Sequence, residues 1–199
     1  MHTPKTFIFS GISGSGKGTQ IELLKKYVKE QMPNNGECAF VMGDVLRSFV
    51  KGEGYAQDMI RDTMNRGELI PDYVSGGLFV SSLLRDLHHD DHLFIDGIPR
   101  SVVQSDIIMS MLKFYNRSDV FIINIGIGAE EAKKRMSLRK RHDDTEEAIV
   151  ERIKFYNDEV APAIQYLKEK SGFTYFEIDG ERTIEEIHLD LVNRLKDIL

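Results

Sequence analysis

The stretch Gly11-Ile12-Ser13-Gly14-Ser15-Gly16-Lys17-Gly18-Thr19 decides the fold of this chain. It follows a short apolar segment, residues 6–9, and opens the amphipathic segment 17–31, so it lies at an expected strand-to-helix turn. Glycines at such a turn let the backbone curl until successive N–H groups point inward at phosphate oxygens. A helix N-terminus and the Lys17 ammonium add positive charge at the same place. The stretch therefore predicts a phosphate-binding loop, and no G-x-G-x-x-G dinucleotide fingerprint fits these residues.

Short apolar segments alternate with longer amphipathic ones along the rest of the chain. The apolar segments are brief and rich in β-branched and aromatic residues, as is typical of strands buried on both faces: 6–9, 38–42, 92–95, 120–125 and 173–178. The segments with helical spacing are 17–31, 144–170 and 183–198. This alternation predicts one α/β domain over residues 1–199, with three layers and a central five-stranded parallel sheet. Residues 43–87 hold helical candidates and no expected strand, which indicates a helical insertion.

Composition and charge exclude several classes of protein. The 199 residues are 41% hydrophobic and 29% charged, as in an ordinary soluble globular domain. The single cysteine, Cys38, permits no internal disulfide and no multi-cysteine zinc site. A net charge of −6 argues against a nucleic-acid or membrane-surface partner, although residues 133–141 hold six basic residues in nine. The apolar run at 6–10 is too short for a signal peptide, so we expect a cytoplasmic protein.

The variant Gly16-Lys17-Gly18-Thr19 resembles the phosphate loop of adenylate kinases and related nucleoside-monophosphate kinases. Further blocks of that family follow in order and with fitting spacing, from Gly11 to about Gly180: Gly43-Asp44-Val45-Leu46-Arg47, Gly67-Glu68-Leu69-Ile70-Pro71-Asp72, Asp96-Gly97-Ile98-Pro99-Arg100, Arg141-His142-Asp143-Asp144 and Ile178-Asp179-Gly180. The resemblance implies a P-loop NTPase-type fold. It also implies that residues 42–70 form the monophosphate-binding insertion.

For the acceptor, the resemblance implies an AMP site with two phosphate clamps, Arg47 and Arg100. Gln104 would read the adenine edge, where pyrimidine-preferring relatives carry Asn. Met42 stands where the family usually has Thr or Ser against the base, so one hydroxyl contact is missing. The remaining residues expected around AMP are Glu68, Leu69, Ile70, Gly97, Arg141 and Arg152.

For the donor, the resemblance implies that Lys17 and the loop hold ATP. The other residues expected around ATP are Gly14, Ser15, Gly16, Gly18, Thr19, Arg135, Arg139 and Arg182. Asp96 ends an apolar segment and would orient the water shell of Mg²⁺ in Mg-ATP. The expected catalytic set is Lys17, Arg100, Arg139, Arg141 and Arg152.

The expected lid is very short. Only Lys140 separates Arg139 from Arg141, so residues 136–142 would form a vestigial lid, and the zinc-binding lids of the family are excluded. We expect incomplete shielding of the site and some ATP hydrolysis without an acceptor. The run His88-His89-Asp90-Asp91-His92 looks like a metal cluster, but it directly precedes an expected strand and fits a polar loop better.

These features predict a monomeric enzyme that transfers a phosphoryl group reversibly from Mg-ATP to AMP, giving two ADP. Two alternatives stay open. A kinase for UMP, CMP or another monophosphate is favoured by Met42 and opposed by Gln104. A catalytically weak nucleotide-binding regulator is opposed by the presence of Lys17, Asp96 and the arginine set.

Overall fold

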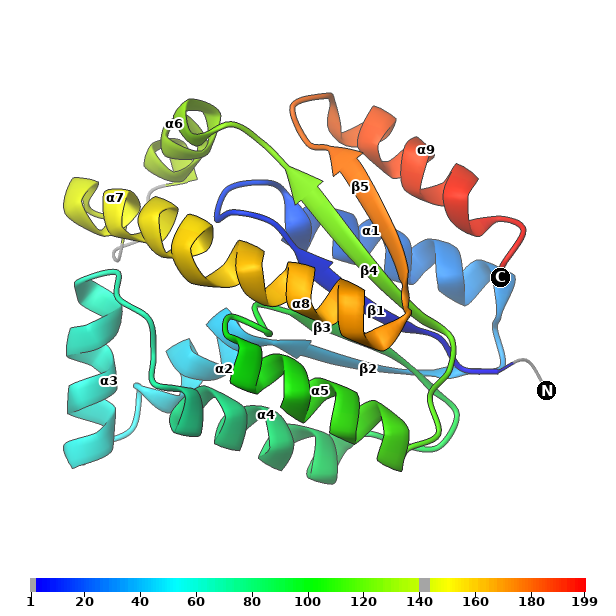
Figure 1. Cartoon of the computed structure of the whole chain (residues 1–199), viewed down its shortest axis with the longest axis horizontal. Coiled ribbons are helices and arrows are strands. Elements are labelled where there is room, and N and C mark those ends of the chain that lie inside the picture. Colours follow the sequence, from blue (N-terminus) through cyan, green and yellow to red (C-terminus); the bar gives the residue numbers. More distant parts are fainter. Residues whose placement is uncertain (1–2, 140–143) are drawn as a thin grey trace.

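The computed structural model describes residues 3–139 and 144–199. It has a three-layer α/β architecture around a five-stranded, wholly parallel sheet with the strand order β2-β3-β1-β4-β5, as expected (Figure 1). The strands are β1 (Thr6–Ser10), β2 (Gly36–Val41), β3 (Asp91–Asp96), β4 (Val120–Gly126) and β5 (Thr174–Asp179). Because all five are parallel, their carboxyl ends lie along one edge of the sheet.

The central strand β1 explains why the apolar segments are continuous. Ile8 pairs in register with Ile95 of β3 and Ile122 of β4, and all three side chains are fully buried in one hydrophobic cluster. Phe7 and Phe9 point to the opposite face, into a second cluster. Since successive strand residues alternate between faces, a strand with helices on both sides needs apolar residues at every position.

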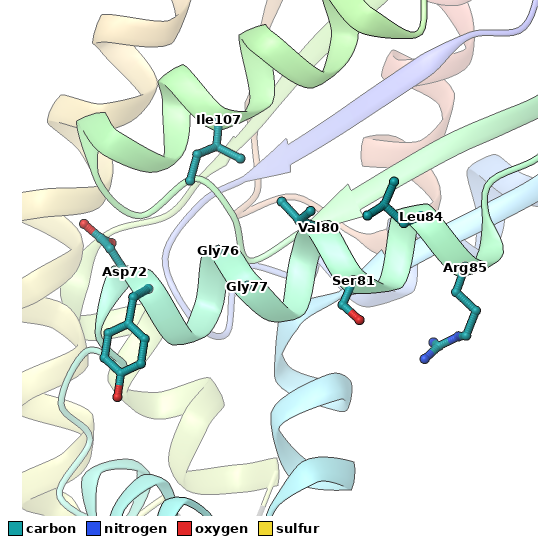
Figure 2. A pocket seen from close by; sticks show the side chains of 9 residues that line it. Asp72, Gly76, Gly77, Val80, Ser81, Leu84, Arg85 and Ile107 are labelled. Atoms are coloured by element: carbon teal, nitrogen blue, oxygen red, sulfur yellow. The ribbon is translucent and has the colours of Figure 1, made fainter.

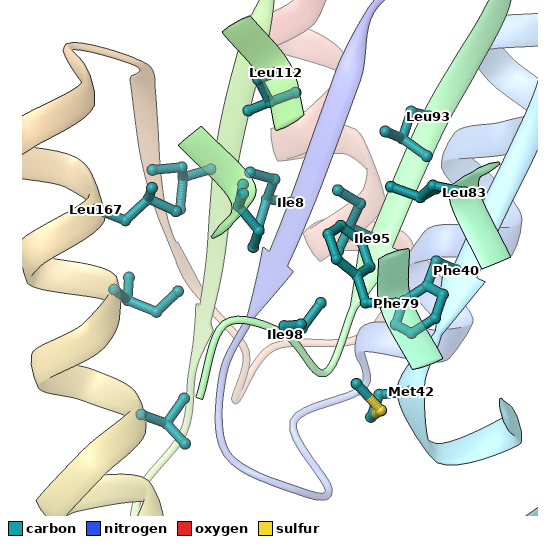
Figure 3. Packing of buried hydrophobic residues seen from close by; sticks show 14 of the residues in the cluster. Ile8, Phe40, Met42, Phe79, Leu83, Leu93, Ile95, Ile98, Leu112 and Leu167 are labelled. Carbon is teal, nitrogen blue, oxygen red and sulfur yellow. The ribbon is translucent and has the colours of Figure 1, made fainter. Parts of the chain in front are cut away.

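Helices cover both faces of the sheet (Figure 1). On one face, α1 (Lys17–Gln31) and α9 (Ile184–Leu195) pack on β1 and its neighbours through Leu24 and Leu191, which are fully buried. On the other face lie α4 (Asp72–Asp86), α5 (Val102–Phe114) and α8 (Ala161–Ser171), whose buried members include Phe79, Ile108 and Leu167 (Figure 3).

The stretch after β2 holds three helices and no strand, as predicted for residues 43–87. It forms α2 (Met42–Phe49), α3 (Tyr55–Asn65) and α4. Met42, expected as the last strand residue, instead begins α2. In Figure 3 its side chain lies near Phe40 and Phe79 in the core, and it is 0% exposed. Figure 1 shows α3 standing well away from the sheet.

The expected single helix over 144–170 is wrong in two respects. The segment divides into α7 (Glu146–Phe155), a π-helical turn (Tyr156–Val160) and α8. It also begins later, because the Thr145 side chain caps α7 by accepting from the Ala148 N–H. Asp144 therefore precedes the helix and is free for another role. Preceding this segment, α6 (Ala129–Arg139) carries Arg135 and Arg139 on one face, as their spacing predicts.

No helix within the described ranges is long and apolar enough to cross a membrane.

Candidate active site

A cleft of about 650 Å³ opens at the carboxyl ends of β1, β2 and β3. The phosphate loop, the helical insertion, α6, α7 and the π-helical turn form its walls. Within the described residues, six cationic side chains line it: Lys17, Arg47, Arg100, Arg135, Arg139 and Arg152. Four acidic side chains line it as well: Glu22, Asp44, Glu68 and Asp96. In a chain with a net charge of −6, this excess of cations marks a site for a strongly anionic ligand.

The phosphate loop leads from β1 directly into α1. Gly16 is the N-cap of α1, with a left-handed backbone (φ 94°) and no side chain to cap the first helical N–H groups. Those N–H groups and the helix dipole therefore face the cleft, where a phosphate can satisfy them. Lys17 lines the same cleft, and its Nζ donates to the carbonyls of Gly11 (2.6 Å) and Ile12 (3.2 Å) in its own loop.

Gly11 shows why the loop needs glycine where the strand ends. Its φ is +135°, and a Cβ there would lie 2.3 Å from the Ile125 carbonyl oxygen of β4. A side chain would therefore force the loop away from the sheet. The close approach holds the loop against β4 and fixes the direction in which its N–H groups point.

Asp144 joins the two arginines on the far wall. Arg139 donates to both of its carboxylate oxygens (2.5 and 2.7 Å), and Arg152 of α7 donates to Oδ1. The Asp144 side chain is only 1% exposed. Burial alone would raise the pKa of this carboxyl, but the hydrogen bonds and charges of Arg139 and Arg152 outweigh burial and lower it. Asp144 is thus charged, and it brings two guanidinium groups together at the cleft.

Arg100 and Asp96 lie at the end of β3. The Arg100 Nε donates to the Gly97 carbonyl (2.7 Å), and the guanidinium lies 6.0 Å from the ring centroid of Phe155. Burial, reinforced by the nearby Arg152 and opposed by Asp96, lowers the pKa of Arg100. The guanidinium still carries its charge, because arginine is not deprotonated in proteins. Arg100 is therefore a desolvated cation that faces the cleft.

The insertion supplies the opposite wall. Arg47 of α2 faces the cleft with its Nη2 donating to Asp44 Oδ1 (2.6 Å). Gly67, Glu68 and Ile70, which follow α3, line the cleft beyond it. Gly97, at φ +81°, brings the β3 end against Met42, where an added Cβ would lie 2.9 Å from the Met42 Cβ. The wall therefore combines the Arg47 cation and the acidic Asp44 and Glu68 with apolar side chains such as Ile70.

Most of the residues expected at the site line this cleft. Of the residues expected around ATP, the cleft is lined by Gly14, Gly16, Lys17, Gly18, Thr19, Arg135 and Arg139. Of the residues expected around AMP or Mg²⁺, it is lined by Arg47, Glu68, Ile70, Asp96, Gly97, Arg100 and Arg152. Arg141 lies outside the described residues.

Five expected residues do not line the cleft. Met42, expected against the base, is packed in the core, and Gln104 is buried between α4 and α5. Leu69 is half-buried and Ser15 is buried beneath the loop. Arg182 donates to Asp190 (2.7 Å) and to the Asp179 carbonyl. Met42 packs in the core because burial of its apolar side chain stabilises the fold, whereas burial of a Thr or Ser hydroxyl would not.

Sequence reasoning missed three groups that the structure brings to the cleft. Asp144 belongs to the R-x-D-D block, but the resemblance assigns it no role at the site. Phe155, the last residue of α7, and Tyr156, the first residue of the π-helical turn, also line the cleft. π-Helical turns are frequent at functional sites. No residue pattern predicts where one forms, because tertiary packing decides where the helix takes up the extra residue of the wider turn.

A second hollow, of about 660 Å³, lies on the outer face of α4 (Figure 2). Figure 2 shows Ile107 of α5 above Gly76 and Gly77 of α4, with Val80 and Leu84 further along α4. Its charged lining residues are Asp72 and Arg85, and Arg85 is paired with Asp86. A hollow with so little positive charge does not suit a phosphate ligand, so the strand-end cleft is the candidate active site.

A phosphate loop after β1, an aspartate at the end of β3 and an arginine-lined cleft above a parallel sheet define a nucleotide-binding protein of the P-loop class. The family model described as adenylate kinase matches residues 9–172. The chain therefore belongs to the adenylate kinase family, and it is a phosphotransferase of the nucleoside-monophosphate kinase type.

Similar curated proteins span almost the whole chain. The adenylate kinase of Prochlorococcus marinus (strain MIT 9301) is 31% identical over 191 residues, covering 96% of this chain and 98% of the relative. Adenylate kinase 1 of Nostoc sp. (strain PCC 7120) is 28% identical over 92% of this chain and 95% of its own length. The adenylate kinase of Dehalococcoides mccartyi (strain BAV1) is 28% identical over 95% of this chain and 97% of its own length.

Proposed function

We propose that the protein transfers a phosphoryl group reversibly from Mg-ATP to AMP, forming two ADP. The observation that carries the proposal is the distribution of cations in one cleft. Lys17 lies at the start of α1, Arg47 on α2 of the insertion, Arg100 just after β3, and Arg139 and Arg152 on α6 and α7, and all five line the cleft. Such a set of cations would neutralise the negative charge of both the donor and the acceptor phosphates.

The reaction needs no catalytic base. A phosphate monoester has its second pKa near ~6, so the acceptor phosphate is a nucleophilic dianion at neutral pH. The protein's task is to align donor and acceptor and to stabilise charge on the transferred phosphoryl. In this proposal Lys17 and the loop N–H groups bind the donor phosphates. Arg47 and Arg100 bind the acceptor, and Arg139, Arg152 and Arg141 surround the transferred group.

The residues present fit a magnesium ion held through water. Asp96 Oδ1 is buried at the end of β3 and has no hydrogen-bond partner among the described residues, and Asp96 lines the cleft. A buried carboxylate oxygen without a hydrogen-bond partner can accept a hydrogen bond from a metal-bound water. When bound, Mg²⁺ neutralises charge on the donor phosphates. The described residues contain no cluster of three or more His, Cys, Asp or Glu that could hold a metal by itself.

The proposal extends to organisation and location. Residues 42–70 act as the monophosphate-binding insertion and residues 136–142 as a minimal lid, and the enzyme is a cytoplasmic monomer. Sedimentation at micromolar concentration measures the oligomeric state. ATP turnover without acceptor measures how well so short a lid shields the donor phosphate, and we expect a rate above background.

The central test is Lys17→Met, measured by ADP formation from ATP and AMP. Loss of the lysine charge at the donor phosphates should lower kcat by about a hundredfold or more. The melting temperature should change little, because the Lys17 side chain faces the cleft and is not part of the hydrophobic core. Lys26→Met, on the exposed side of the same helix, is the matched control and should keep wild-type turnover. Near-wild-type turnover of Lys17→Met would contradict the proposal.

The same assay of ADP formation distinguishes an enzyme from a nucleotide-binding regulator. A nucleotide-binding regulator would bind ATP but form no ADP with any monophosphate acceptor. The full set of cleft cations favours the enzyme, because binding alone does not require guanidinium groups on both sides of the transferred phosphoryl.

A further inference from the structure

The arginines that line the cleft are held in two different ways. Most of those that the structure describes donate to carboxylates of the protein, in the pairs Arg47–Asp44, Arg135–Glu131, Arg139–Asp144 and Arg152–Asp144. Arg100 differs, because within the described residues no hydrogen bond or ion pair joins its guanidinium to a carboxylate. This arginine therefore needs another source of stabilisation.

Two groups contact the Arg100 side chain. Its Nε donates to the Gly97 carbonyl (2.7 Å), and its guanidinium lies over the ring of Phe155, 6.0 Å from the ring centroid. The face of an aromatic ring attracts a cation, and this attraction is stronger where water is excluded. Burial lowers the pKa of Arg100, as expected for a guanidinium that has lost much of its hydration. The Phe155 ring thus stabilises a charge that water does not.

The ring and a carboxylate stabilise a guanidinium with different consequences. A carboxylate accepts from the same N–H groups that would bind a phosphate, so it competes with an anionic ligand. An aromatic ring has no oxygen to accept these hydrogen bonds, so the Nη groups of Arg100 stay available. Phe155 therefore holds the cation in the cleft without taking the place of the phosphate.

The position of Phe155 is itself fixed by the fold. Phe155 is the last residue of α7, directly before the π-helical turn, and it packs against the hydrophobic cluster that contains Ile98 and Val160. Arg152 lies three residues earlier on the same helix, so both side chains are on one face of α7, and both line the cleft. The ring is therefore supported from the core while it contacts Arg100.

We propose that Phe155 is a positioning residue for the acceptor phosphate: its ring holds the Arg100 guanidinium in the cleft with the Nη groups open to an anion. The inference rests on the proposed function, in which Arg100 binds the acceptor. Phe155 acts through Arg100 and makes no bond to the reacting groups.

Phe155→Leu keeps an apolar side chain but removes the aromatic face. We expect the KM for AMP to rise about three- to tenfold, because Arg100 is then held less firmly, while the KM for ATP stays within about twofold of wild type. Phe155→Tyr keeps the aromatic face and should restore the KM for AMP to within about twofold of wild type. Steady-state kinetics with Mg-ATP and AMP measure both constants.

The matched control is Phe114→Leu, at an exposed phenylalanine that ends α5, and it should leave both constants unchanged. General damage to the fold would act on both substrates and would not be reversed by tyrosine. An unchanged KM for AMP in Phe155→Leu, an equal rise in both constants, or failure of Phe155→Tyr to restore the KM for AMP overturns the inference.

A measurement without turnover separates this inference from the proposed function. The Arg100 Nε–H is bonded to the Gly97 carbonyl, and the ring current of Phe155 changes the magnetic field at its proton. Its NMR resonance, assigned by its loss in Arg100→Lys, should shift in Phe155→Leu and stay near the wild-type position in Phe155→Tyr. If the wild-type protein phosphorylates no monophosphate, the proposed function fails. If it phosphorylates AMP and the resonance does not move in Phe155→Leu, only the inference fails.

Discussion

The Asp144 carboxylate holds two cationic side chains in one place. Arg139 and Arg152 are 26% and 12% exposed, so all three groups are largely removed from water. Guanidinium groups that line one cleft repel each other, and a carboxylate between them offsets this repulsion. A lowered pKa for Asp144 means that its ionised form is favoured in the folded state. Its contribution to stability is present above the unfolded pKa near 4 and is lost as pH falls through the lower folded pKa.

Asp144→Asn tests this role. The amide keeps the shape of the side chain but removes the charge, so Arg139 and Arg152 should separate. We expect kcat to fall about tenfold or more and the free energy of unfolding to fall by about 2 kcal/mol. Steady-state kinetics and urea denaturation measure the two effects. Asp86→Asn, which removes the charge from an exposed pair with Arg85, should change neither, and equal effects of both variants would contradict the role.

At the scale of elements, α9 shows how local sequence places a helix. Thr183 accepts from the Glu186 N–H, and Glu186 accepts in return from the Thr183 N–H, so a reciprocal capping box begins the helix. Buried Ile187, Leu191 and Leu195 then follow at helical spacing. The cap and the apolar stripe agree, so the start of this helix could be predicted to within one residue, whereas its end lies three residues before the expected 198.

Thr183→Ala should lower the free energy of unfolding by about 1 kcal/mol, because the first N–H groups of α9 lose their acceptor. Turnover should stay at the wild-type level, since Thr183 does not line the cleft. Thermal denaturation measures the loss, and Thr183→Ser, which keeps the hydroxyl, should restore most of it. Failure of the serine variant to restore stability would show that the cap is not the cause.

At the scale of the whole molecule, a buried polar group joins β1 to β3 at the sheet edge opposite the cleft. His92 is 3% exposed, and its Nδ1 accepts from the Lys5 N–H (3.0 Å). Burial, together with the positive charges of Arg117, Lys5 and Lys29 and against Asp91, lowers the pKa of His92 to about 4. The neutral imidazole is the form that the fold requires.

The pH dependence of stability follows from this lowered pKa. In the unfolded chain His92 binds a proton near pH 6.5, so its contribution is complete above that pH and is lost as pH falls from 6.5 toward 4. His92→Asn keeps an acceptor for Lys5 but does not titrate, so the free energy of unfolding should depend less on pH between 6.5 and 5. Chemical denaturation at both values measures the difference. His89→Asn, on an exposed histidine, should retain the wild-type slope, and identical slopes for His92→Asn and wild type would contradict the assignment.

Most of the fold could be predicted because its signals are local. Strands buried on both faces are continuous apolar runs in the sequence, and the glycines from Gly11 to Gly18 mark the turn of the phosphate loop between β1 and α1. The break of residues 144–170 into α7, a π-helical turn and α8 could not be predicted, because the apolar spacing of both helices is the same and packing decides where the extra residue goes.

The sequence by itself determined the α/β class, the phosphate loop and most of the cationic side chains that line the cleft, since these depend on periodicity, glycine geometry and residue chemistry. Only the tertiary structure decided how those side chains are used. Met42 is a core residue, Asp144 joins two arginines, and Gln104 is bonded to Asp72 and Ser75 of another helix. A polar side chain binds whichever partners the fold brings within hydrogen-bond distance, and those partners lie up to 32 residues away for Gln104.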